Sequence, residues 1–263
     1  MGRTRLFAKG INSMKCQIVI PARLASTRLP RKVLLNETGK PLIQHVWEGA
    51  SQSKLASGVT IAADDEEIVQ AVRAFGGDCV LTSKNIACGT DRIAVVAREM
   101  PDVDVFVNVQ GDEPEILGDS VDTVAALLRD HPEAVMATLC TPIRTLEKAH
   151  DPSCVKVVFD ELGRALYFSR SLIPFPRDGV TEADLQNDPP VFFQHLGIYA
   201  YRRDFLLKIS SLPRTKLEKL ESLEQLRVLE NGYEIMVGVV PRASIGIDTP
   251  ADYAEFVKKW LGK

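Results

Sequence analysis

Apolar runs rich in Val and Ile alternate with helical segments along the first 140 residues, and few folds accommodate that order. The runs at 16–22, 59–63 and 103–109 are typical of buried strands. Helical periodicity covers 42–52 and 64–75. Parallel strands must be joined by long crossover connections, which helices supply. The order therefore predicts one doubly wound α/β domain with a mostly parallel sheet.

The rhythm changes after about residue 140. Strands predicted at 155–159, 165–169 and 195–201 follow one another without long helices between them, which indicates antiparallel pairing. We therefore expect a largely antiparallel insertion spanning 140–215. Further elements are expected at 79–81, 119–129, 135–139, 216–230 and 235–240, with a final helix opened by Asp248-Thr249-Pro250.

The length of 263 residues suits a single domain, which we expect to span 14–263. Residues 1–13 lack the apolar core of a secretory signal and are predicted to be a short disordered extension. No apolar run approaches the roughly 18 residues that cross a bilayer, so no membrane partner is expected. Five cysteines without C-x-x-C spacing indicate reduced thiols and hence a cytoplasmic protein.

Positive charge is concentrated at the start of the chain. The first 40 residues hold nine Lys and Arg residues against one acid, Glu37, although the whole chain carries a net charge of −3. Nucleic acid, a membrane surface or a polyphosphate would each suit such a segment. The stretch 21–32 lacks glycine, so it is neither a Walker loop nor a dinucleotide fingerprint. It directly follows a predicted strand, and its cations, with Ser26 and Thr27 between them, predict a polyphosphate-binding loop.

Two carboxylates stand near the ends of predicted strands and helices. Asp112 follows the strand at 103–109, and Asp248 precedes the final helix. Proteins hold Mg²⁺ with one or two carboxylates together with substrate phosphates. Taken alone, Asp248 is also a good helix N-cap and Asp112 a turn residue.

The stretch PARLASTRLPRK at 21–32 resembles the nucleotide-binding loop of the CMP-Kdo synthetase family, the 3-deoxy-manno-octulosonate cytidylyltransferases. The resemblance runs from about residue 15 to the end of the chain. Further stretches resemble that family in the same order: ACGTDR at 87–92, NVQGDEP at 108–114, VKVVFD at 155–160, ALYFSRSLIP at 165–174, HLGIYAY at 195–201, LESLEQLR at 220–227 and GIDTPAD at 246–252.

This resemblance implies a Rossmann-like nucleotidyltransferase fold and a homodimer, with 140–215 contributing to sugar binding and dimer contact. It implies that the chain transfers CMP from CTP to 3-deoxy-D-manno-octulosonate (Kdo), giving CMP-Kdo and pyrophosphate for lipopolysaccharide synthesis. The anomeric hydroxyl of the sugar would attack the α-phosphorus of CTP in line. Asp112 and Asp248 would hold the Mg²⁺.

The same resemblance assigns roles to the remaining site residues. The catalytic set is Arg23, Arg28, Lys32, Asp112 and Asp248. The nucleotide-binding set is Ala22, Arg23, Ser26, Thr27, Arg28, Lys32, Gly89, Thr90, Arg92 and Gln110. The sugar-binding set is Gln110, Arg170, His195, Tyr199, Glu221 and Gln225. In the helix predicted at 216–230, Glu221 and Gln225 are four apart and would share one face.

Two positions depart from the family pattern. The family often has Gly where this chain has Arg31, and Ser where it has Cys88. Arg31 adds bulk and charge beside the polyphosphate loop and changes its expected path. Cys88 is a weaker hydrogen-bonding group than Ser, so a side-chain contact there should be weaker.

Several alternatives stay open. The acidic sugar could be an 8-amino analogue of Kdo or a sialic acid, although the sialic-acid enzymes usually have a different first loop and lack HLGIYAY. A nucleic-acid-binding protein could use the basic start, but the sequence offers no aromatic stacking pattern and the rest of the chain is acidic. An inactive nucleotide sensor would not be expected to keep both Asp112 and Asp248.

Overall fold

The computed structural model describes residues 14–86 and 88–262, so the predicted extension 1–13 lies outside the described residues. A nine-stranded sheet forms the centre of this described part, with seven strands in the order β3-β2-β1-β4-β8-β5-β9. The strands are β1 Cys16–Ala22, β2 Ala56–Ala63, β3 Asp78–Leu81, β4 Val105–Asn108, β5 Met136–Pro142, β6 Lys156–Phe159, β7 Ala165–Ser169, β8 Phe193–Arg202 and β9 Ile235–Val239.

All sheet pairs along that order are parallel except the two made by β8, which lies antiparallel between β4 and β5. This arrangement confirms the predicted mixed α/β fold with a mostly parallel sheet. The helices are α1 Leu42–Ala50, α2 Glu66–Ala74, α3 Gly89–Glu99, α4 Gly118–Asp130, α5 Leu146–His150, α6 Arg203–Ile209, α7 Lys216–Glu221, α8 Gln225–Glu230 and α9 Pro250–Leu261, with short 3-10 turns at Lys32–Leu34 and Asp184–Gln186.

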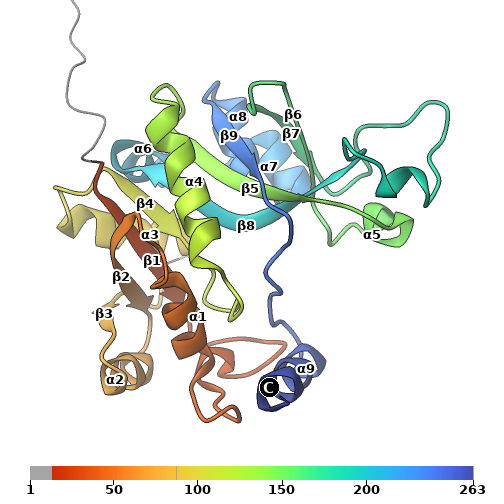
Figure 1. Ribbon diagram of the computed structural model, residues 1–263. Helices are drawn as coiled ribbons and strands as arrows, with labels where there is room; N and C mark the ends of the chain where they lie inside the picture. The colour runs from red at the N-terminus through yellow and green to blue at the C-terminus, as the bar shows by residue number, and fades with distance from the viewer. Residues whose placement is uncertain (1–13, 87, 263) are drawn as a thin grey trace, which may run out of the picture.

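Helices cover both faces of the sheet, because the central strands are apolar on both sides. In β1, Ile18 and Ile20 pack into one core with α1, α2 and α4. Val19 points the other way, into a second core with α3, α6 and α8. Figure 1 shows α4 on the near face of β5 and the strand ends of β1 and β4 opening toward the loops below.

The final helix is capped by a different residue from the one its sequence suggests. Thr249 is the N-cap of α9, in a capping box with Asp252. Asp252 accepts hydrogen bonds from the backbone N–H groups of Asp248 and Thr249, at 3.0 and 2.8 Å. The carboxylate of Asp248 is therefore free of the capping role. Figure 1 shows the chain running from β9 down to α9, beside α1 and the loop that follows β1.

The helix predicted over 216–230 is wrong in its middle. The chain forms α7, breaks at Ser222, and starts again as α8. Ser222 is left-handed (φ 53°, ψ 47°), and the N–H of Leu223 reaches back to the carbonyl of Glu218 at 3.2 Å, which ends the helix as a C-cap does. The break buries Leu223 in the second core, so Glu221 and Gln225 do not share one helix face.

The segment between β5 and β8 leaves the main sheet as the hairpin β6–β7 and a long loop. Lys156 of β6 fixes this excursion. Its side chain is fully buried, and its Nζ donates to the carbonyls of Asp151, Cys154 and Arg170 at 2.9, 2.7 and 2.6 Å. One ammonium group thereby joins the segment 151–154 to the residue that follows β7. Within the described residues, no helix is long and apolar enough to cross a membrane.

Candidate active site

A cavity of about 530 Å³, here called the charged cavity, lies where β1 and β4 end. Gly111 lets the two strand ends approach, because a Cβ at this position would lie 2.8 Å from the carbonyl oxygen of Pro21. Asp112 follows directly and so faces the basic loop. The predicted residues that line this cavity are Arg23, Ser26, Thr27, Arg28, Lys32, Gly89, Gln110, Asp112 and Asp248.

Lys32 stands between the two carboxylates. Its Nζ lies 2.7 Å from Asp112 Oδ2 and 3.1 Å from Asp248 Oδ1, and only 11% of its side chain is exposed. Arg28 reaches the same Asp248 oxygen at 3.1 Å but is 67% exposed. The two carboxylates, 136 positions apart in sequence, thus converge on one point, marked here by an ammonium group.

This convergence fits a divalent cation. Two carboxylates that one cation already bridges, beside a loop suited to phosphates, are the donor set that Mg²⁺ takes in proteins. No cluster of three or more His, Cys, Asp or Glu side chains occurs among the residues that the structure describes. Substrate phosphates would have to complete the coordination.

The basic loop is anchored from behind. The N–H of Leu24 donates to Asp64 Oδ1 at 2.9 Å, and Arg23 donates to the carbonyl of Ile86 at 3.3 Å. Arg92 is fully buried, with its guanidinium 3.8 Å from Asp64, and it donates to Thr82. Arg92 lines neither this cavity nor the next one. Arg92 was predicted to bind nucleotide, but its buried position indicates that it supports the basic loop instead.

Arg31 occupies a backbone conformation that explains why glycine suits this position. Its φ is 57°, in the left-handed region, and its guanidinium pairs with Glu67 on α2. The side chain therefore points away from the charged cavity rather than into it. Cys88 acts as the N-cap of α3, since its Sγ accepts from the N–H of Asp91 at 3.4 Å. Burial raises the pKa of this thiol to about 12, so it stays uncharged.

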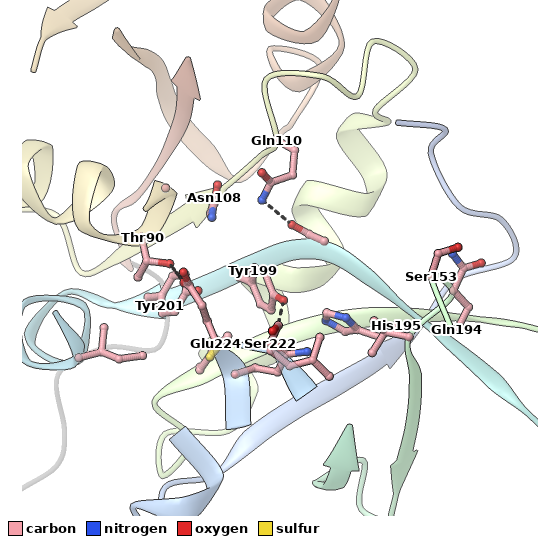
Figure 2. A pocket seen from close by; sticks show the side chains of 17 residues that line it. Thr90, Asn108, Gln110, Ser153, Gln194, His195, Tyr199, Tyr201, Ser222 and Glu224 are labelled. Atoms are coloured by element: carbon pink, nitrogen blue, oxygen red, sulfur yellow. Dashed lines mark hydrogen bonds between the residues drawn. The ribbon is translucent and has the colours of Figure 1, made fainter. Parts of the chain in front are cut away.

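A second cavity of about 390 Å³, here called the polar cavity, adjoins the first, and Gly89 and Gln110 line both. Figure 2 shows Asn108 and Gln110 on one side of it, opposite Tyr199 and His195. Gln110 donates to the carbonyl of Gly197 at 2.9 Å. Predicted residues lining this cavity are Gly89, Thr90, Gln110, His195, Tyr199 and Gln225.

Three polar atoms in the walls of the polar cavity are buried and have no hydrogen-bond partner within the described part of the chain. They are Asn108 Oδ1, Gln194 Oε1 and Gln225 Nε2. An unmet buried polar group costs about 1–3 kcal/mol. Side-chain amides beside one cavity whose hydrogen-bonding capacity is unmet are suited to a ligand that carries several hydroxyl groups.

His195 lies beside a buried hydroxyl group. Thr138 Oγ1 lies 3.0 Å from His195 Nε2, and it also lies 3.2 and 2.8 Å from the main-chain carbonyl oxygens of Leu196 and Ile198. Burial lowers the pKa of His195 to about 3, and burial raises that of Tyr199. Both side chains stay neutral at physiological pH.

The structure places three other predicted residues outside the cavity walls. Arg170 donates to the carbonyls of Glu221 and Pro152 at 2.7 and 3.1 Å, and Glu221 accepts from Ser169 Oγ and the N–H of Arg170. These two side chains bond to each other's segments rather than facing the polar cavity. Ala22 is buried at the end of β1.

Sequence reasoning missed several residues in these walls. Asn108, Gln194, Ser153, Ser222 and Glu224 line the polar cavity, and Glu224 accepts from Thr90 Oγ1 at 2.9 Å. Three of them belong to stretches that resemble the family, Asn108 to NVQGDEP and both Ser222 and Glu224 to LESLEQLR, but only the fold shows that they line the cavity.

Comparison with known proteins gives a consistent result. The family model described as cytidylyltransferase matches residues 17–235. A 3-deoxy-manno-octulosonate cytidylyltransferase of Rhodopirellula baltica is 48% identical, over 94% of this chain and 98% of its own. One of Geobacter sulfurreducens is 45% identical, over 94% and 99%.

Solved structures agree in fold. CMP:2-keto-3-deoxy-manno-octonic acid synthetase complexed with CTP superposes with a TM-score of 0.87 at 43% identity, over 94% of this chain and 99% of that one. A 4-diphosphocytidyl-2C-methyl-D-erythritol synthase of Anaerococcus prevotii, at 14% identity and a TM-score of 0.61 over 96% and 98%, shares the fold.

Proposed function

This chain belongs to the cytidylyltransferase family, and from that premise we propose that it transfers CMP from CTP to Kdo, releasing pyrophosphate. The observation that carries the proposal is the pair of adjoining cavities. One is lined by cations and two convergent carboxylates, and the other by neutral polar groups with unmet hydrogen-bonding capacity. They meet at Gly89 and Gln110, where a phosphate in one cavity could be reached by a hydroxyl group in the other.

The reaction needs no covalent protein intermediate. The anomeric hydroxyl of the sugar acid loses its proton to solvent and its oxygen forms a bond to the α-phosphorus, while the bond from that phosphorus to the bridging oxygen breaks and pyrophosphate leaves with the electron pair. Catalysis of such transfers rests mostly on positioning and on neutralising charge. Arg23, Arg28 and Lys32 would balance the triphosphate, with Ser26 and Thr27 donating to its oxygens.

Asp112 and Asp248 would hold Mg²⁺, which when bound neutralises phosphate charge and lowers the pKa of a coordinated hydroxyl group. Lys32, which pairs with both carboxylates here, would then be released toward the phosphates. The carboxylates and the ammonium group therefore exchange partners when the nucleotide arrives.

The polar cavity would select the sugar acid. The hydroxyl groups of the sugar acid would exchange hydrogen bonds with the side chains of Asn108, Gln194, His195, Tyr199 and Gln225. Glu224 also lines this cavity and would pair with an ammonium group, so an 8-amino analogue of Kdo is the second candidate substrate.

The decisive experiment measures pyrophosphate release with each nucleoside triphosphate, crossed against Kdo, 8-amino-Kdo and sialic acid, with Mg²⁺ or with EDTA. Release only with CTP, Kdo and Mg²⁺ is the expected result. Preference for 8-amino-Kdo would change the assignment of the sugar substrate and leave the proposed mechanism unchanged. No release from folded protein with any combination would overturn the proposal.

We further propose that the protein is a cytoplasmic homodimer that supplies CMP-Kdo for lipopolysaccharide synthesis. All five cysteines are free thiols, which suits a reducing compartment. Leu162 and Leu166 on the β6–β7 hairpin and Val239 on the edge strand β9 are 66%, 61% and 51% exposed, and exposed apolar side chains of this kind suit a protein contact. Sedimentation of the wild type against Leu166→Glu tests this: a stable monomer in the wild type would contradict it.

A further inference from the structure

Asp248 reaches Asp112 from a segment without regular structure. The chain leaves β9 at Val239 and enters α9 at Pro250, and no helix or strand forms in the ten residues between them. Such a segment has many accessible conformations, so its ordering carries an entropic cost. Whatever holds it in place decides whether the two carboxylates converge.

Two contacts tie this segment to the turn that carries Asp112. The N–H of Ile247 donates to the main-chain carbonyl of Asp112 at 2.9 Å. Ser244 Oγ donates to the carboxylate of Glu113, the residue that follows Asp112. The first contact uses only backbone atoms, whereas the second depends on two side chains that the reaction described above does not use.

Glu113 is well placed for this task. Its other oxygen, Oε1, lies 3.5 Å from the point where a Cβ on Gly197 would stand, and the carbonyl of Gly197 accepts from Gln110. The carboxylate is thus enclosed between β8 and the Ser244 segment. The hydrogen bond from Ser244 therefore lies in an enclosed place between two segments of the chain.

We propose that Glu113 is a positioning residue: through Ser244 it holds the Asp248 segment against the Asp112 turn and so sets the affinity of the two carboxylates for the metal. The inference rests on the proposed metal role of Asp112 and Asp248. It assigns to Glu113 no contact with substrate. Removing the bond should loosen Asp248 and leave Asp112 in place, because Asp112 is fixed by the end of β4.

The test measures Mn²⁺ binding by proton relaxation enhancement with CTP bound and no sugar acid, so that turnover does not intervene. We expect Ser244→Ala and Glu113→Ala to weaken Mn²⁺ binding by about tenfold, the effect of losing the one side-chain hydrogen bond that joins the two segments. Glu113→Gln should restore most of the affinity, because the amide oxygen still accepts from Ser244.

A matched control exists far from the site. Ser53 Oγ donates to Asp122 Oδ1 at 2.5 Å, also joining a loop to a carboxylate, and Ser53→Ala should leave Mn²⁺ affinity unchanged. Equal affinity in Ser244→Ala and Ser53→Ala would overturn the inference. If the wild type binds Mn²⁺ no better than Asp112→Asn, the metal assignment itself fails, and the two failures are thereby distinguished.

Discussion

The charged cavity and the polar cavity share two residues but differ in how their side chains are held. Around the first, cations pair with partly exposed carboxylates, and Arg28 and Asp248 are 67% and 46% exposed in their side chains. Around the second, His195 and Gln225 are buried and neutral. Exposed ions can exchange partners when a charged ligand arrives, whereas buried dipoles hold a fixed pattern that a ligand must match. The difference suggests that one region supplies charge and the other supplies selectivity.

The largest effect should come from the charged cavity. Asp112→Asn should lower kcat/KM on the order of a thousandfold, because a metal supplies several kcal/mol of charge stabilisation and each 1.36 kcal/mol is tenfold in rate. Steady-state pyrophosphate release measures it. Thermal unfolding should change little, since Asp112 is partly exposed. Turnover near that of the wild type, with the same Mg²⁺ dependence, would remove the proposed contrast between the cavities.

A substitution in the hairpin beside the polar cavity should act mainly on the stability of the protein. Lys156→Met would leave three carbonyl groups without their shared donor, and we expect it to lower the free energy of unfolding by about 3 kcal/mol, because a buried carbonyl that loses its donor costs about 1–3 kcal/mol. Folded protein at low temperature should show a raised KM for the sugar acid and an unchanged KM for CTP. Equal changes in both KM values would show that the hairpin supports the cavities alike.

Low pH should lower the free energy of unfolding of the protein because of His195, which lines the polar cavity. Its pKa in the folded state is about 3, below the unfolded value of 6.5, so as pH falls below about 6.5 the unfolded chain takes up a proton that the folded chain does not. Stability is then lost by up to about 1.4 kcal/mol per pH unit until the folded pKa is reached. Denaturant unfolding between pH 7 and 4 should be flatter in His195→Gln. The exposed His150, changed to Gln, serves as the control.

The smallest effect is expected at Arg31. Arg31→Gly relieves the left-handed backbone conformation, but it raises the conformational entropy of the unfolded chain and removes an exposed ion pair, so the free energy of unfolding should change little. Arg31→Ala keeps the strain and loses the pair. It should therefore be less stable than Arg31→Gly, and chemical denaturation can rank the two. KM for CTP should be little altered in either variant.

Much of the fold follows from local sequence. The strand at 16–22 matches β1 at both ends, because an apolar run rich in Ile and Val has few other solutions. The predicted helix at 216–230 fails at Ser222, since every residue there tolerates a helix and the break serves the burial of Leu223. Tertiary packing decided that segment, and no local pattern records it.

The sites divide in the same way. The cluster of cations at 21–32 predicted a binding loop from the sequence, and the structure brings Lys32, Asp112 and Asp248 together. The unmet polar atoms of Asn108 and Gln194 left no such trace, because an Asn or Gln in a strand gives no sign of whether its partner exists. Neutral recognition is set by which groups remain unpaired after folding, and that is a property of the whole molecule.

The contact between Lys32 and Asp248 spans 216 positions of the chain, and this separation has a consequence for synthesis. A growing polypeptide emerges from the ribosome with its first strands available to fold early. Its basic loop, however, must wait until the segment that carries Asp248 has been translated before it meets its second carboxylate. A chain halted before residue 248 would carry the cations without the group that completes the site.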